Sequence, residues 1–222
     1  MAGIAFDPDS LTFSAEIGSF LADSVHSIDL SCNTLMHGVE AGLCNVKPLF
    51  APQALSELGK KLTEETLISW LISKRFNSVD IFAKPEQKYP GSNEECDLVL
   101  HLSRNRQFWI EAKLAWRRWY NCNGSAKGSS SFNGYLHGDA THPGAAHDFR
   151  KLERVTRVDA EWMGVLLIGF DSLKAPMDSA VKELEACEKL VERGWSMVAT
   201  QKWTDRRNPL FRINCWFWTR SN

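Results

Sequence analysis

The clearest pattern in the chain is an alternation of apolar and polar residues between Glu95 and Ala115, which predicts two short strands joined by a tight polar turn. Side chains alternate between the two faces of a strand, so every second residue shares a face. The apolar face of this predicted hairpin is formed by Cys96, Leu98, Leu100, Leu102, Phe108, Ile110, Ala112 and Leu114. The opposite face is mixed, and it carries Asp97 on the first strand and Glu111 and Lys113 on the second.

The register between the two strands decides whether these charged side chains meet. A slip of one residue would turn an apolar face outward, so apolar positions should lie beside apolar positions. Asp97 then shares a face with Glu111 and Lys113, provided that the turn has an odd number of residues, such as Arg104-Asn105-Arg106. Two registers satisfy this condition. Asp97 lies opposite Lys113 with Glu111 on the diagonal, or, after a shift of one step, it lies directly opposite Glu111.

The rest of the hydrophobic pattern predicts helices and strands on both sides of the hairpin. Helices are expected over Ala15–Val25, Gln53–Phe76, Ala145–Asp159 and Met177–Arg193. Strands are expected over Val79–Ala83, Gly164–Phe170, Ser196–Lys202 and Phe211–Thr219. The continuous apolar run Gly164–Phe170 is typical of a strand in the middle of a sheet. Segments 84–93 and 120–144 contain Gly, Pro, Ser and Asn and are expected to be loops.

Length and composition indicate a soluble globular protein, and the order of the predicted helices and strands indicates the α/β class. With 222 residues and 44% hydrophobic residues, the chain can form one full core, with residues 51–222 as the main domain and the weakly patterned residues 1–50 as an extension packed on it. No apolar run approaches the roughly 20 residues of a membrane span, and the N-terminus does not resemble a signal peptide. The six cysteines are scattered without a CxxC pair, which favours reduced, mostly buried thiols in a cytoplasmic protein.

The net charge of −1 does not indicate a generally basic protein, but the charge is unevenly distributed. Residues 1–60 are acidic, whereas residues 112–158 have a clear excess of Lys and Arg, and a local basic stripe of this kind favours contact with phosphates. Most of the nine tryptophans are expected in the core. Trp116, Trp119 and Trp203 lie close to arginines in the sequence, and an alternative is that they stack on bases.

The order of the predicted elements over residues 53–170 is helix, three strands, helix and strand. Together with Asp97, Glu111-Ala112-Lys113 and their place on neighbouring strands, this order resembles the core of the PD-(D/E)XK nucleases, the restriction-endonuclease-like fold. The C-terminal helix and strands and the N-terminal extension would be additions to that core. The family's usual Pro before the Asp is replaced here by Cys96.

The resemblance implies a catalytic site for phosphodiester hydrolysis. Asp97, Glu111 and the Ala112 carbonyl would bind Mg²⁺, with Mn²⁺ as a substitute, because hard oxygen ligands suit these ions. Lys113 would orient or help to deprotonate the attacking water, or neutralise the charge on the phosphate. The family also places a Glu on the first helix, and Glu64 fits its Leu spacing better than Glu65, although both stay open.

The E-x-K motif alone is weak, since one copy is expected by chance in a chain of this length. A second copy, Glu86-Gln87-Lys88, lies between Pro85 and Pro90 in a segment expected to be a loop, and we reject it because no strand would orient it. A surface salt bridge between Lys113 and an acid is the simpler alternative for the first copy.

Basic residues after the motif are candidates for nucleic-acid contacts: Arg117, Arg118, Arg150, Lys151 and Arg154. A solvated helix face is the alternative for the last three. Asp148 is interpreted as a helix N-terminal charge rather than a ligand. His137, His142 and His147 near Cys122 match no standard zinc spacing.

The sequence therefore predicts a Mg²⁺-dependent DNA endonuclease, with RNA as a weaker alternative substrate. The second hypothesis is a catalytically inactive subunit of the same fold that binds DNA or assembles with other proteins. A homodimer is compatible with either hypothesis, and no membrane partner is expected.

Overall fold

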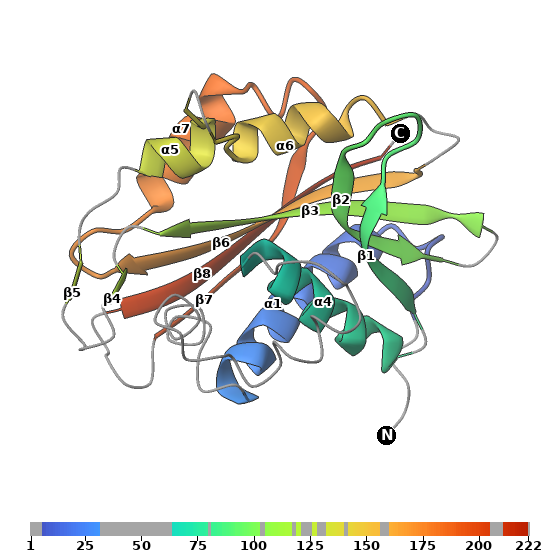
Figure 1. Ribbon diagram of the computed structural model, residues 1–222, viewed down its shortest axis with the longest axis horizontal. Helices are drawn as coiled ribbons and strands as arrows, with labels where there is room; N and C mark the ends of the chain where they lie inside the picture. Colours follow the sequence, from blue (N-terminus) through green and yellow to red (C-terminus); the bar gives the residue numbers. More distant parts are fainter. Residues whose placement is uncertain are drawn as a thin grey trace.

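A computed structural model describes residues 6–31, 64–79, 81–102, 105–116, 119–120, 126–127, 132–139, 142–155, 160–204 and 211–221. Its centre is a six-stranded mixed sheet in the order β1-β2-β3-β6-β8-β7, as Figure 1 shows. The strands are β1 (Phe82–Lys88), β2 (Glu95–His101), β3 (Gln107–Trp116), β6 (Trp162–Ser172), β7 (Ser196–Thr204) and β8 (Phe211–Ser221). Strands β3 and β6 are parallel and all other neighbours are antiparallel. The predicted α/β class is confirmed.

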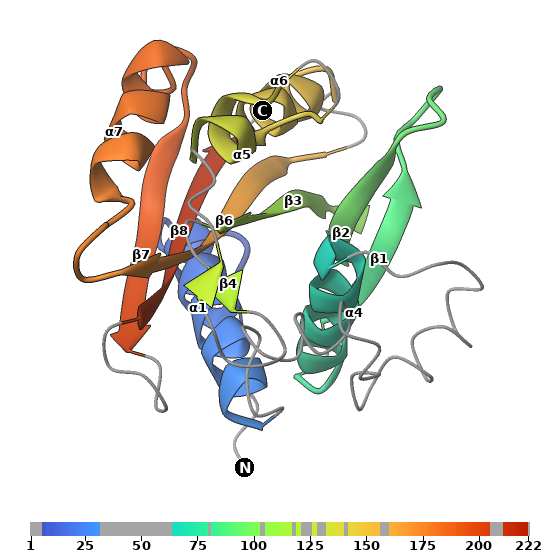
Figure 2. The same cartoon turned by 60° about the vertical axis from the view of Figure 1, so that its left-hand side comes forward.

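Helices cover both faces of this sheet (Figures 1 and 2). On one face lie α1 (Phe13–Ser31) and α4 (Glu64–Asn77), and on the other lie α5 (Phe132–His137), α6 (Ala145–Leu152) and α7 (Asp178–Cys187). The two faces bury separate apolar clusters, because alternate residues of each strand point to opposite sides. Thus Leu98 and Ile110 pack toward α1 and α4, whereas Val99 and Trp109 pack toward α6.

Strand β6 runs through the middle of the sheet, as its continuous apolar sequence predicted. It pairs with β3 on one side and with β8 on the other. Leu166 contributes to one apolar cluster and Val165 to the other, so both of its faces are buried. The expected aromatic core is also found, and its buried tryptophans are Trp70, Trp109, Trp162, Trp195, Trp216 and Trp218.

The first strand extends further than the sequence predicted. A strand was expected over Val79–Ala83 and a loop over 84–93, but β1 begins at Phe82, continues to Lys88 and pairs with β2 as far as Glu95. Pro85 is tolerated because β1 is an edge strand and does not need every N–H for pairing. Glu86 has a φ of 52°, and the pairing is interrupted there, but the register is the same on both sides, with Pro85 opposite Leu98 and Gln87 opposite Cys96.

Two helices end earlier than expected. Helix α6 ends at Leu152 rather than at Asp159, and α7 ends at Cys187 rather than at Arg193. Lys189 has a φ of 50°, a left-handed conformation that cannot continue a right-handed helix. The chain then turns until Gly194, whose φ of 83° suits glycine, and enters β7.

The segment 120–144, expected to be a loop, contains helix α5 and the whole of the two-residue strand β5 (Ala126–Lys127). It also contains the second residue of β4 (Trp119–Tyr120), which pairs with β5. Near the N-terminus, α1 is longer than the expected Ala15–Val25 and packs against α4, β7 and β8. The first half of the helix expected over Gln53–Phe76 and the boundary between residues 50 and 51 lie outside the described residues. Among the helices described, none is long and apolar enough to cross a membrane.

Candidate active site

Asp97 and Glu111 lie opposite each other on β2 and β3. The two strands pair Leu98 with Ile110, Val99 with Trp109 and Leu100 with Phe108, and the next step along this register joins Asp97 to Glu111. The N–H of Leu102 donates to the Arg106 carbonyl at 2.8 Å, so the turn between them has three residues. The predicted odd turn is confirmed, but it starts one residue earlier than Arg104. This shift selects the second of the two predicted registers.

The backbone ladder between β2 and β3 ends next to Asp97. Its last regular pair is Leu98 and Ile110, and beyond it the Ala112 N–H donates to Asp97 Oδ2 at 2.7 Å. A side-chain carboxylate therefore takes the place of a backbone acceptor. Figure 2 shows the β1–β2 hairpin projecting away from β3. Since the pairing ends at Leu98 and Ile110, Asp97 and Glu111 stand where the two strands separate.

Glu111 is almost completely buried, and two side chains from other elements hold one of its oxygens. Lys151 Nζ, from α6, lies 2.7 Å from Glu111 Oε1 and also donates to the Glu95 carbonyl at 2.7 Å. The hydroxyl of Tyr89, at the end of β1, donates to the same Oε1. Burial, with Cys96 and Glu111 nearby, raises the pKa of Tyr89 far above its usual value, so the hydroxyl stays a donor. A cation shared with Asp97 would therefore use Oε2 of Glu111.

Lys113 lies on the same face as Asp97 and Glu111, as parity predicted, and it points toward α6. Its Nζ is 3.7 Å from Asp148 Oδ2, and Asp148 is itself buried in the first turn of α6. Asp148 occupies the helix N-terminal position expected for it, and in addition it holds the Lys113 ammonium group. The amine therefore lies beside the carboxylate pair, in an orientation set by a second acid.

The site holds two neighbouring acids, of which Glu111 is buried and Asp97 is half-buried. Burial, followed by the charge of Glu111, raises the pKa of Asp97 well above its usual value. Burial and the charge of Asp148 raise the pKa of Glu111, although Lys151 opposes this effect. The Asp97 and Glu111 side chains are close enough to hydrogen-bond, so a proton or a cation between them would relieve their repulsion.

This donor set fits a Mg²⁺ ion. Mg²⁺ keeps several waters and needs only one or two protein carboxylates, which Asp97 and Glu111 can supply from facing strands. In the described part of the chain, no cluster of three or more His, Cys, Asp or Glu side chains is arranged to hold a metal ion. The Ala112 carbonyl would have to complete the protein ligands, and a zinc site built from His137, His142 or His147 receives no support.

The other predicted site residues are placed differently. Arg150 lies on α6 but pairs with Glu188 at 2.5 Å, after the end of α7, while Arg154 is exposed in the turn that follows α6. Glu64 is the first residue of α4, and its side chain lies outside the description, as do Glu65, Arg117 and Arg118. The rejected second motif, Glu86-Gln87-Lys88, lies on strand β1 and not in a loop as expected. Strand β1 is the edge of the sheet, and Lys88, opposite Glu95 in the strand register, is exposed.

Two contacts in the site were not expected from the sequence. Nothing in the sequence pointed to the contact of Tyr89 with Glu111, because Tyr89 stands in a segment that was expected to be a loop. The link from α6 to β3 had a signal, since Asp148 and Lys151 are three residues apart and so share one face of a helix. Trp203, a candidate for base stacking, is half-buried and packs on His26 with ring centroids 4.8 Å apart.

Comparison of this chain with protein-family models, curated proteins and solved structures gave no match. The fold and site define an α/β protein with a mixed sheet and a pair of facing carboxylates, the buried Glu111 and the half-buried Asp97.

Proposed function

We propose that this protein is a metal-dependent nuclease that hydrolyses phosphodiester bonds, with DNA as substrate and internal cleavage as the mode. The observation that carries the proposal is the position of Asp97 directly opposite Glu111, with Lys113 on the same face of β3. Two adjacent carboxylates and an amine are the groups needed to hold a divalent cation and a water beside a phosphate.

The order of elements supports this proposal. Helix α4, strands β1, β2 and β3, helix α6 and strand β6 follow one another as in the restriction-endonuclease-like core, with α5 and the short strands β4 and β5 inserted before α6. On this proposal α1, α7, β7 and β8 are additions to that core. The protein would act in the cytoplasm, alone or as a homodimer that cuts both strands.

Each group has a defined role in the proposed reaction. Asp97 and Glu111, with the Ala112 carbonyl, would hold Mg²⁺, which supplies a polarised phosphate and a more acidic water. Lys113 would orient the attacking water and stabilise negative charge on the phosphate, and Asp148 holds Lys113 in place. The water oxygen would bond to phosphorus as the bond from phosphorus to the leaving oxygen breaks. The water would lose one proton and the leaving oxygen would gain one from solvent, which gives a phosphomonoester and a hydroxyl group. Tyr89 and Lys151 orient Glu111 through Oε1.

One observation favours a second candidate function. Lys151 already supplies a positive charge to Glu111 at 2.7 Å, so the site has an internal cation that substitutes in part for a metal ion. A protein that had lost catalysis would retain its fold through such a pair. The second candidate is therefore a non-catalytic subunit that binds DNA or assembles with partner proteins.

The test is cleavage of plasmid, linear DNA and RNA by the purified protein with Mg²⁺, Mn²⁺ or EDTA. We expect metal-dependent cleavage by the wild type, loss of it in Lys113→Ala, and no loss in Lys182→Ala, which removes an exposed lysine on α7. No cleavage of any substrate with either metal would favour the non-catalytic candidate. Cleavage that persists in Lys113→Ala would refute the assigned site.

A further inference from the structure

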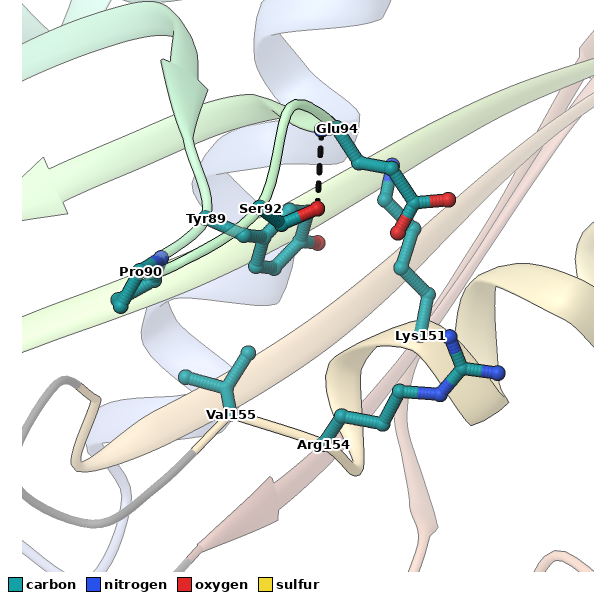
Figure 3. Close-up of a pocket in the computed structure, with 7 residues that line it drawn as sticks. All are labelled: Tyr89, Pro90, Ser92, Glu94, Lys151, Arg154 and Val155. Carbon is teal, nitrogen blue, oxygen red and sulfur yellow. Dashed lines mark hydrogen bonds between the residues drawn. The ribbon is translucent and has the colours of Figure 1, made fainter.

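A pocket of about 360 Å³ lies beside Glu111, between the turn that joins β1 to β2 and the end of α6 (Figure 3). The turn contributes Tyr89, Ser92 and Glu94, and the α6 side contributes Lys151 and Arg154. The pocket therefore has walls from two parts of the chain that are far apart in sequence.

This pocket shares two of its side chains with the carboxylate pair. Tyr89 and Lys151 both line it, and both contact Glu111 Oε1 directly. The two side chains also support each other, since Lys151 Nζ lies 4.9 Å from the centre of the Tyr89 ring. A group bound in the pocket would thus lie next to the site where the proposed reaction takes place.

The charged groups of the pocket favour an anion on one side and oppose it on the other. Lys151 and Arg154 supply two positive charges. Glu94 extends from the turn toward the side of Lys151 and Arg154 in Figure 3. Since Lys151 is already paired with Glu111, Arg154 is the residue best placed to bind an incoming anion.

We propose that this pocket binds a phosphate group of the nucleic-acid strand next to the bond that is cut, with Arg154 as its main ligand and Glu94 limiting its affinity. The proposal rests on the proposed function, because it takes the strand to pass Asp97 and Glu111. A planar guanidinium makes paired hydrogen bonds to phosphate oxygens, which gives orientation as well as affinity. The phosphate would be either a strand end or an internal phosphodiester.

Arg150 provides a matched control for Arg154. Both are exposed arginines of the same segment, one turn apart, but Arg150 pairs with Glu188 and does not line the pocket. A basic surface that attracts DNA without a defined pocket would respond equally to the loss of either charge. A pocket would respond to Arg154 alone.

The experiment is binding of short labelled single-stranded DNA in EDTA, followed by fluorescence anisotropy over a range of salt concentrations. We expect Arg154→Gln to weaken binding about tenfold, as for the loss of one charged hydrogen bond, and to lower the slope of log Kd against log salt concentration by about one. Arg150→Gln should leave both values unchanged, and Glu94→Gln should strengthen binding severalfold. Equal effects of the two arginine variants, or no effect of Arg154→Gln, would overturn the proposal.

Oligonucleotides with and without a 5′-phosphate distinguish the two sources of the ligand. Sensitivity to Arg154→Gln only with the phosphorylated strand identifies a strand end, and equal sensitivity with both identifies an internal phosphodiester. Binding is measured without metal, so it does not depend on catalysis. Arg154-dependent binding without cleavage would refute only the nuclease proposal, whereas cleavage with binding unaffected by Arg154→Gln would refute only the pocket.

Discussion

Lys151 and Glu111 form an ion pair across the site, with Nζ of the lysine 2.7 Å from Oε1 of the glutamate. Both side chains are largely buried, and the pair joins α6 to β3. A buried pair of this kind contributes little net stability, but the loss of one partner leaves a buried charge without compensation. The pair therefore matters both for the fold and for the affinity of the site for a metal ion.

Replacing Lys151 by Met should destabilise the protein and increase its response to Mg²⁺. We expect a loss of up to about 3–5 kcal/mol in the free energy of unfolding, because Glu111 loses its cation. Saturating Mg²⁺ should raise the melting temperature more in Lys151→Met than in the wild type, since no ammonium group competes for the carboxylate. Denaturant titration and thermal unfolding measure the two effects.

Two further variants control this prediction. The double variant Glu111→Gln with Lys151→Met should recover most of the lost stability, because it removes both charges. Lys182→Met changes an exposed lysine on α7 and should alter neither stability nor the Mg²⁺ response. An equal Mg²⁺ response in Lys151→Met and the wild type would argue against a cation site at Glu111.

Replacing Asp97 by Asn should stabilise the protein while abolishing cleavage. The charge of Glu111 lies close to Asp97, and the raised pKa of Asp97 reflects burial together with that charge. Asn keeps an oxygen that can accept the hydrogen bond from the Ala112 N–H but carries no charge. We expect a gain of about 0.5–2 kcal/mol in the free energy of unfolding near pH 7. A clear loss of stability in denaturant titration would contradict this account.

Glu153 should make the stability of the protein fall in acid. Partial burial raises the pKa of Glu153, but hydrogen bonds from Arg193 and Trp195 and the charges of Arg193 and Arg220 outweigh it and hold the pKa below its usual value. A carboxyl group with a lowered pKa stabilises the fold above the pKa of the unfolded state, near 4.5, and this contribution is lost as the pH falls through the folded value.

The variant Glu153→Gln tests this dependence. It should be less stable than the wild type by about 1–3 kcal/mol at pH 7, because charged hydrogen bonds to Arg193 are lost. The difference should shrink as the pH falls below 4.5, and unfolding by urea at a series of pH values measures it. A difference that stays constant down to pH 3 would mean that the carboxylate charge is not responsible.

The contact between β6 and β8 should not tolerate a methyl group at Gly164. A Cβ there would lie 2.5 Å from Cζ of Phe217 and 3.0 Å from the Phe108 ring, both in the core. We expect Gly164→Ala to cost about 1–3 kcal/mol, measured by denaturant unfolding. Gly134→Ala in α5 meets no atom within 4 Å and should be neutral or stabilise by up to about 1 kcal/mol.

The sequence alone determined the face of most residues of the hairpin, although Cys96, expected on the face of Leu98, packs instead in the cluster of Val99 and Trp109. Because side chains alternate along a strand, the apolar positions of the hairpin placed Asp97, Glu111 and Lys113 on one surface, and the structure confirms this arrangement. The continuous apolar run predicted the central strand β6 for a similarly local reason, since a strand buried on both faces needs no polar positions. The predicted ends of α7 and β1 were wrong, because the left-handed conformation of Lys189 cannot continue the helix and pairing with β2 extends the strand.

Only the tertiary structure decided the contacts that complete the site. Alternation repeats every two residues, so it cannot distinguish a register that places Asp97 opposite Glu111 from one that places it opposite Lys113. The hydrogen bond from Tyr89 and the ion pair from Lys151 both reach Glu111 from segments that lie far apart in the chain. A local pattern gives the face on which a side chain lies, whereas its partner across a gap depends on how separate elements pack together.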